Sequence, residues 1–248
     1  MSGDSERRFR EFVVALAVLI LAAAPARAEW VAAAYLGAAR TASAPLAIVQ
    51  PAAGTDVTFT AVPYDGESFR SPLYYGYRLT YFPRQESWWG FEAEFIHLKA
   101  YADTAQRTHV SGRHHGAPIE ADIPIEAILN RFSISHGLNF LVFNAVARRS
   151  IGARAGASGY VVLVARVGAG PTIPHAESTI DGVDREGYAW GAAALHLAGG
   201  VEVRVWRGLG AIAEYKYTRT RQTVDVARGE ARGVFSSHHG IVGVAVRL

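Results

Sequence analysis

One short segment of the chain places a histidine and a carboxylate on a stiffened backbone. Pro174-His175-Ala176-Glu177 follows an apolar run that ends at Gly168 and Gly170, with Pro171 in between. Proline restricts the backbone around it, and glycine permits close approach at the end of a strand. Imidazole and carboxylate groups can bind a transition metal or transfer protons near neutral pH. Proline and glycine also end ordinary strands, so the segment by itself favours neither interpretation.

The sequence contains nine histidines, and all except His196 are expected near or beyond one end of the strands. Folding could bring several of them together as a metal site or a general acid/base site. The candidates are His97, His136, His175, Glu177 and His239. For any single histidine other than His175 we prefer the alternative of a solvated side chain or a contact with lipopolysaccharide phosphates, and we prefer it above all for His114 and His115. These two lie in a Gly-Arg-His-His-Gly segment that we expect to be a flexible loop.

Alternation of apolar and polar residues predicts the elements that must position these side chains. In one segment Leu73, Tyr75, Tyr77, Leu79 and Tyr81 share a face, which is the period of a strand. Strands of about 9–11 residues are the length needed to cross a bilayer at a tilt. Eight such segments are predicted, at about 30–39, 72–82, 88–99, 133–146, 159–172, 189–206, 209–219 and 237–248.

Short and long connections alternate between these eight segments. Pro83 to Ser87 and the turn near Gly208 are short, whereas the intervening connections are longer. This pattern is typical of outer-membrane barrels, which have short periplasmic turns and long outer loops. We therefore predict an all-β fold, an eight-stranded antiparallel transmembrane β-barrel. A soluble β-sandwich is the alternative, but it would have shorter strands and an apolar core.

Charged residues on the other face of the strands predict a filled interior. An eight-stranded barrel is just wide enough for side chains. Buried charges of near-equal number must pair, so we expect a polar, plugged interior and no pore. The inward charges are predicted to be Arg78, Arg166, Arg204, Lys216 and Arg247 with Glu92, Glu94, Glu202 and Glu214.

The N-terminus has the features of a secretory signal peptide. Three arginines precede an apolar run from Phe12 to Ala24, and Ala26-Arg27-Ala28 matches a cleavage signal. We expect residues 1–28 to be removed, leaving a single barrel domain at 29–248 in the bacterial outer membrane. Removal of four arginines and three acids leaves 21 basic and 19 acidic residues. This balance argues against a nucleic-acid partner, and the absence of cysteine excludes disulfides and a thiol nucleophile.

A serine hydrolase is a further option, because some outer-membrane barrels deacylate lipid A. Ser135, Ser178 and Ser236 lie close to histidines in the sequence. Adjacent residues of a regular strand point to opposite faces, so Ser135 and His136 are not expected to act as a dyad.

Several motifs, in order along the chain, together resemble lipid A oxidase-like outer-membrane barrels. They are His136-Gly137-Leu138-Asn139 with Asn144 and Arg148, Gly168-Ala169-Gly170 through Pro174-His175-Ala176-Glu177, and Glu214-Tyr215-Lys216-Tyr217. Phe91 to Lys99 resembles the third strand of that family, and His239 with Gly243-Val244 resembles its closing strand. The likeness covers nearly all of the chain after the signal peptide.

The resemblance implies an oxygen-dependent enzyme that oxidises the proximal glucosamine of lipid A to an aminogluconate unit. The motif side chains that could perform this chemistry are His175, Glu177, His97 and His239. It implies lipopolysaccharide as partner and dioxygen as co-substrate; the cofactor stays unknown, with a divalent transition metal as one option. We expect a monomer. The alternatives are a non-catalytic barrel that displays surface loops, and a lipid A deacylase.

Overall fold

The computed structural model describes residues 28–85, 87–152, 161–206 and 208–248. The expected signal peptide therefore lies almost wholly outside the described residues. Nearly all of the described chain is β-strand, and none of the described helices is long and apolar enough to cross a membrane.

Eight strands form a closed antiparallel barrel. They pair in the order β1-β5-β6-β10-β11-β14-β15-β16, and β16 pairs with β1 to close the ring. The predicted eight-stranded barrel is confirmed, and each predicted segment corresponds to one of these strands. Their bounds are β1 (Glu29–Thr41), β5 (Tyr75–Phe82), β6 (Trp89–His97), β10 (Arg131–Ile151), β11 (Val161–Gly170), β14 (Ala194–Trp206), β15 (Leu209–Val226) and β16 (Gly229–Arg247).

The outside of the barrel is a broad apolar surface. Side chains such as Tyr77, Phe91, Phe143 and Val242 are more than half exposed there. A soluble monomer rarely exposes so large a continuous apolar surface, whereas a barrel in lipid requires it. The barrel therefore has a lipid-facing exterior.

Ion pairs across the barrel identify the inward face. Arg78 on β5 contacts Glu214 on β15 at 2.9 Å, and Arg166 on β11 contacts Glu92 on β6 at 2.9 Å. These strands are not neighbours, so the contacts must pass through the interior. A cavity beside Arg78 and Arg166 has a volume of about 30 Å³, enough for roughly one water. The predicted plugged, ion-paired interior is therefore present along the described residues.

The structure adds two interior charges that the sequence pattern missed. Glu29, the first residue of β1, accepts hydrogen bonds from Arg148 at 2.6 Å and pairs with Arg247 at 2.9 Å. Arg148 also lies over the ring of Phe82, with its guanidinium carbon 3.5 Å from the centroid. Glu29 stands at the start of its segment, where alternation has too few residues to assign a face.

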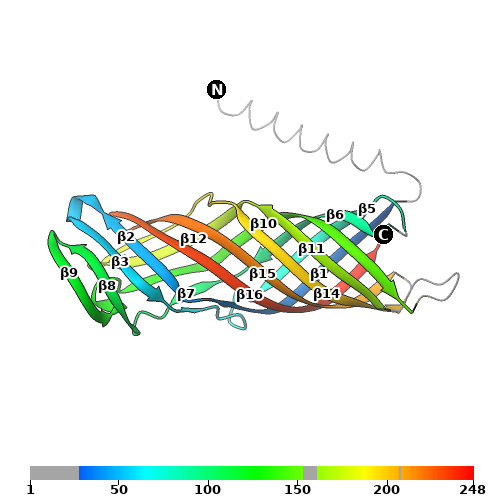
Figure 1. Cartoon of the computed structure of the whole chain (residues 1–248), viewed down its shortest axis with the longest axis horizontal. Coiled ribbons are helices and arrows are strands. Elements are labelled where there is room, and N and C mark those ends of the chain that lie inside the picture. Colours follow the sequence, from blue (N-terminus) through cyan, green and yellow to red (C-terminus); the bar gives the residue numbers. More distant parts are fainter. Residues whose placement is uncertain (1–27, 86, 153–160, 207) are drawn as a thin grey trace, which may run out of the picture.

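The end of the barrel opposite the C-terminus is extended by further strands, where we expected loops (Figure 1). On one side β2, β3, β8 and β9 continue the sheet from β16. On the other side β12 continues along β10 beyond β11, and β13 pairs with β12. The bounds are β2 (Ala44–Gln50), β3 (Thr55–Val62), β4 (Tyr64–Asp65), β7 (Ala100–Ala102), β8 (Arg107–His114), β9 (Ala117–Pro124), β12 (Thr172–Ile180) and β13 (Val183–Tyr188).

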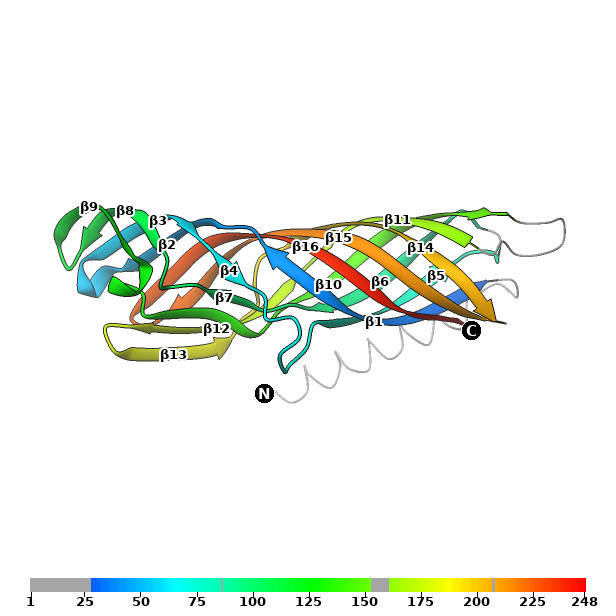
Figure 2. The ribbon, with the colours of Figure 1, turned by 90° about the horizontal axis from the view of Figure 1, so that it is seen from below.

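We call this end the distal end of the barrel. Its strands are joined by tight turns and by two short 3₁₀ helices, η1 (Pro51–Ala53) and η2 (Ile125–Ala127). Inside it lies an apolar core that includes Ile48, Phe59, Val110 and Phe235. Figure 2 shows this extension from below, with β12 and β13 as a separate hairpin beside it.

Candidate functional site

The segment from Gly170 to Glu177 is strand, where the sequence suggested a turn. Gly170 ends β11, and after Pro171 the chain resumes as β12 with partners on both sides. A Cβ atom at Gly170 would lie 1.9 Å from the carbonyl oxygen of Leu141, so glycine is required for this close approach. His175 therefore has a neighbouring strand on either side, which fixes its backbone more firmly than a turn would.

His175 and Glu177 point away from the barrel interior. Thr172, on the opposite face of β12, accepts a hydrogen bond at 2.8 Å from Gln222, whose side chain is buried. Positions of odd number on β12 consequently lie on the outer surface. The ring of His175 packs against that of Tyr188 on β13, with centroids 4.3 Å apart.

A β-bulge in β10 brings His136 to the same place. The pairing of β10 with β12 shifts between Ile134 and Leu138, and Gly137 has a φ of 108°. The Nδ1 atom of His136 lies 3.3 Å from Nδ1 of His175 and 3.3 Å from Oε1 of Glu177. Two imidazoles and one carboxylate thus offer ligand atoms within 4.8 Å of one another.

The carboxylate of Glu177 is held by two further side chains. Arg131 contacts Oε2 at 3.0 Å, and the hydroxyl of Ser135 donates a hydrogen bond to Oε1. Both come from β10, and no pattern in the sequence marks either of them as a partner of Glu177. These contacts fix the orientation of the carboxylate next to the two imidazoles.

Ser135 and His136 were not expected to form a dyad because neighbours on a strand point to opposite faces, but their side chains do not point apart here. The Oγ atom of Ser135 lies 3.1 Å from Nδ1 of His136. Adjacent residues point to opposite faces only in a regular strand, and the bulge interrupts the alternation here. Gly137 is the signal in the sequence that marks the irregularity.

His97 lies beside this cluster and is joined to it through Asn139. Its Nδ1 atom is 2.8 Å from Oδ1 of Asn139, whose amide nitrogen lies 3.4 Å from the carbonyl oxygen of His136. The ring of His97 stacks on Tyr75, with centroids 4.9 Å apart. His97 is therefore a buried neighbour of the cluster and not one of its three ligand-bearing side chains.

His239 is on the other side of the barrel wall. Its Nε2 atom is 2.9 Å from Oγ1 of Thr218, and its Nδ1 atom is 3.0 Å from the hydroxyl of Tyr74. The side chain is buried and faces the ion-paired interior near Lys216. The structure brings His175, Glu177 and His136 together, places His97 next to them, and separates His239 from them.

Lys216 is directed inward, as predicted, and so is Asn144, whereas Asn139 lies on the outer surface with the cluster. The amide of Asn144 donates to Glu92 at 3.0 Å, and its carbonyl oxygen lies 2.8 Å from Nδ1 of His196. Lys216 and Asn144 therefore belong to the interior network.

The cluster lies close to the boundary of the apolar exterior. Along β10, Phe143 is exposed on the lipid-facing surface, and Asn139 and His136 follow on the same side towards the distal end. Tyr75, which stacks on His97, is one of the exposed aromatic side chains of the surface. Aromatic residues of this kind mark the interface between hydrocarbon and lipid headgroups. The cluster thus lies on the outer surface of the wall, on the distal side of the exposed residue Phe143 and close to the exposed ring of Tyr75.

Comparison with known proteins finds no matching protein-family model and no matching curated protein. Among solved structures, the chain is similar to OprG from Pseudomonas aeruginosa, with 10% identity, a TM-score of 0.45, and coverage of 90% of this chain and 96% of that one. It is also similar to Ail from Yersinia pestis in complex with sucrose octasulfate, with 11% identity, a TM-score of 0.39, and coverage of 90% and 99%. A third similar structure is Neisserial surface protein A, with 12% identity, a TM-score of 0.38, and coverage of 88% and 95%.

The features of the fold define the class of this protein. A closed eight-stranded antiparallel barrel with an apolar exterior and a polar, filled interior is an outer-membrane β-barrel. This barrel carries a histidine and carboxylate cluster on the outer surface of its wall.

Proposed function

We propose that this protein is a lipid A-modifying oxidase of the bacterial outer membrane. Its reaction centre would be the cluster of His136, His175 and Glu177, with dioxygen as co-substrate and the proximal glucosamine of lipid A as substrate. The observation that carries the proposal is the position of two imidazoles and a carboxylate together on the outer surface of the wall. In the motif from His136 to Asn139, His136 contributes a ligand atom, Gly137 lies in the bulge, and Asn139 links the cluster to His97. A structural use for each of these motif residues supports the resemblance to lipid A oxidase-like barrels.

The donor set suits a divalent transition metal. Two histidines and one carboxylate with open positions are the ligands of many non-haem iron sites that use oxygen. His136, His175 and Glu177 would hold the ion; the chemistry that it supplies when bound is the activation of dioxygen. Arg131 and Ser135 would keep the carboxylate oriented, as neighbours of metal ligands commonly do.

The proposed reaction is a two-electron oxidation. The glucosamine hemiacetal loses two electrons and two protons at C1 to give a lactone, and dioxygen gains them to become hydrogen peroxide. Water then opens the lactone to the aminogluconate. Arg131, whose side chain is more than half exposed beside the cluster, is suited to bind a headgroup phosphate and orient the sugar.

The contact between Ser135 and His136 makes a deacylase the second candidate. In a serine hydrolase the two ring nitrogens of the histidine have different partners, one the serine and the other the carboxylate. Here Ser135 and Glu177 both approach Nδ1 of His136, and Ser135 donates directly to Glu177. This arrangement does not form a proton relay and favours the oxidase. The third candidate is a barrel without catalytic activity, which would leave lipid A unchanged.

Mass spectrometry of lipid A separates these three functions. The full chain would be produced in outer membranes, and lipid A would be analysed with and without oxygen. The oxidase predicts lipid A with one added oxygen atom that appears only with oxygen. Loss of an acyl chain would indicate the deacylase, and unchanged lipid A under both conditions would refute the oxidase.

The variant His175→Ala tests the location of the reaction. It is expected to abolish oxidation while heat-modifiable gel mobility shows that the barrel still folds. His238→Ala is the matched control, because His238 is an exposed histidine on the outer surface that contacts Tyr215 and not the cluster. Full activity of His175→Ala, or equal loss in both variants, would contradict the assigned site.

A further inference from the structure

Two tight turns meet at the distal end of the barrel. One joins β8 to β9 through His115 and Gly116, and the other joins β12 to β13 through Asp181 and Gly182. All four residues have positive φ angles, between 48° and 79°. Two successive residues of positive φ are the signature of a type I′ turn, which aligns both strands of a hairpin closely. Each turn therefore presents its side chains from a rigid hairpin.

The turn of β8 and β9 is also fixed to its other neighbours. The backbone nitrogen of Gly116 donates to the carbonyl oxygen of Gly54 at 2.9 Å, and that of His115 donates to Thr55 at 3.3 Å. The predicted flexible loop at His114 and His115 is therefore an ordered hairpin.

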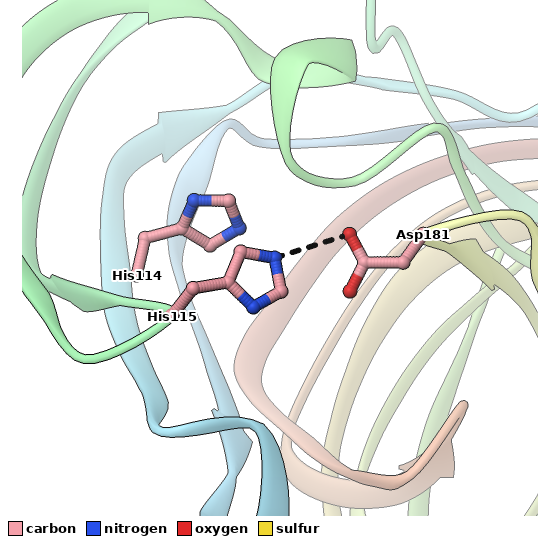
Figure 3. A group of neighbouring side chains, drawn as sticks. All are labelled: His114, His115 and Asp181. Carbon is pink, nitrogen blue, oxygen red and sulfur yellow. Dashed lines mark ion pairs between the residues drawn. The ribbon is translucent and has the colours of Figure 1, made fainter.

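Three side chains from these turns converge on one point (Figure 3). The rings of His114 and His115 are tilted against each other with centroids 4.1 Å apart, and Nε2 of His115 lies 3.4 Å from Oδ1 of Asp181. The Nε2 atom of His114 points to the same space; it is buried and has no hydrogen-bond partner among the described residues. The ligand atoms of all three side chains lie within 4.8 Å of one another.

We propose that His114, His115 and Asp181 form a second metal site, which binds a divalent transition metal, with Zn²⁺ as the best match, and links the two hairpins. Zinc prefers imidazole nitrogen and carboxylate oxygen at about 2.0–2.2 Å in tetrahedral geometry, which separates neighbouring ligand atoms by roughly 3.4 Å. The distance of 3.4 Å between His115 and Asp181 equals this spacing and is long for a hydrogen bond. The fourth position is open to water.

A metal accounts for two features that an ion pair between His115 and Asp181 leaves unexplained. One is the Nε2 atom of His114, which is buried and has no hydrogen-bond partner among the described residues, whereas buried polar atoms are ordinarily hydrogen-bonded. The other is the position of His114, whose ligand atom lies within 4.8 Å of those of His115 and Asp181 although it takes no part in their ion pair. Among the described residues, the ion pair of His115 with Asp181 is a polar side-chain contact that joins these two hairpins.

This site is separate from the proposed reaction centre, which could also bind metal. Zinc binding is therefore measured in a variant whose reaction centre is disrupted. The full chain carrying His175→Ala would be refolded in detergent and titrated with Zn²⁺ by calorimetry. One equivalent is expected to bind. His115→Asn and Asp181→Asn should each weaken binding at least about tenfold, since loss of even an indirect partner of a metal costs 10–100-fold. Asparagine tolerates positive φ, so both turns can be kept.

The control is Asp184→Asn, which removes a carboxylate three residues away on β13. Asp184 accepts a hydrogen bond from Thr179 at 2.5 Å and is not part of the cluster. Its zinc affinity should equal that of the background. Absence of saturable zinc binding, or an equal zinc affinity in His115→Asn, Asp181→Asn and the control, would overturn the proposal.

A second measurement tests the link between the hairpins. Arg113 is exposed beside the turn, so trypsin can report on this hairpin. Zinc should slow cleavage after Arg113 in the background protein and in Asp184→Asn, but not in Asp181→Asn. Cleavage that zinc slows equally in all three would contradict a link through Asp181. Lipid A oxidation by an otherwise unaltered Asp181→Asn chain is expected to be normal, so the two proposals can fail independently.

Discussion

Lys216 is fully buried inside the barrel, and its ammonium group lies against two carboxylates. It contacts Glu214 at 2.9 Å and also Glu94, and it lies 4.4 Å from the ring centroid of Tyr35. Removing one partner of a buried ion pair leaves an uncompensated charge, which costs about 3–5 kcal/mol. We therefore expect Lys216→Met to lower the free energy of unfolding by that amount, measured by denaturant titration in detergent.

Arg219→Met is the control for this prediction. Arg219 lies on the same strand but on the exposed outer surface, so losing its charge should change stability little. The double variant Lys216→Met with Glu94→Gln should recover part of the lost stability, because it removes an unpaired charge. Equal losses for Lys216→Met and Arg219→Met would contradict a paired interior.

At the scale of residues, alternation predicted the inward charges well, because every second side chain of a regular strand shares a face. It could not predict which acid meets which base, since Arg78 and Glu214 are brought together only by closure of the barrel. The same limit applies to the site. His175 and Glu177 were identified from the sequence, whereas Arg131 and Ser135 became partners of Glu177 through strand pairing and a bulge.

At the scale of elements, the bulge in β10 positions the proposed reaction centre, and Gly137 makes it possible. A Cβ atom at this position would lie 2.4 Å from Oδ1 of Asn139 and 2.5 Å from Nδ1 of His97, and the φ of 108° is unfavourable for other residues. Backbone strain of this kind costs of order 1–3 kcal/mol. We expect Gly137→Ala to destabilise the barrel by about that amount and to reduce lipid A oxidation, measured by unfolding and by mass spectrometry.

Gly199→Ala serves as the comparison for Gly137→Ala. A Cβ atom at Gly199 would meet no other atom within 4 Å, so this variant should keep both stability and activity. If Gly137→Ala behaved in the same way, the bulge would not be what positions the cluster. A glycine within a predicted strand is a signal that could have indicated an irregularity, but the bulge itself depends on the pairing between β10 and β12.

At the scale of the whole molecule, the sequence predicted the barrel and not its distal extension. The barrel strands cross the apolar surface and must alternate over their full length, which gives a long signal. The strands β2, β3, β8 and β9 pack an apolar core under one face and are short, so their pattern is difficult to distinguish from that of loops. Strands β15 and β16 are long and continue beyond the ring of eight strands. The extension is attached to this continued part of β16 through β2.

The attachment of β8 and β9 suggests that this hairpin can be removed without loss of the barrel. Its ends are adjacent, because the backbone nitrogen of Ile125 donates to the carbonyl oxygen of Gln106 at 3.0 Å. Beyond its own pairing, the hairpin pairs only with β3 among the described strands, and the eight-stranded ring closes without it.

A chain lacking residues 107–124, with Gln106 joined to Ile125 by two glycines, should therefore retain heat-modifiable gel mobility. It should keep lipid A oxidation, because β10 and β12 carry that cluster, and in the His175→Ala background it should lose zinc binding. A shortened chain that folds but still binds one equivalent of zinc would refute the role of His114 and His115, and one that folds without oxidising lipid A would show that the reaction centre depends on the distal extension.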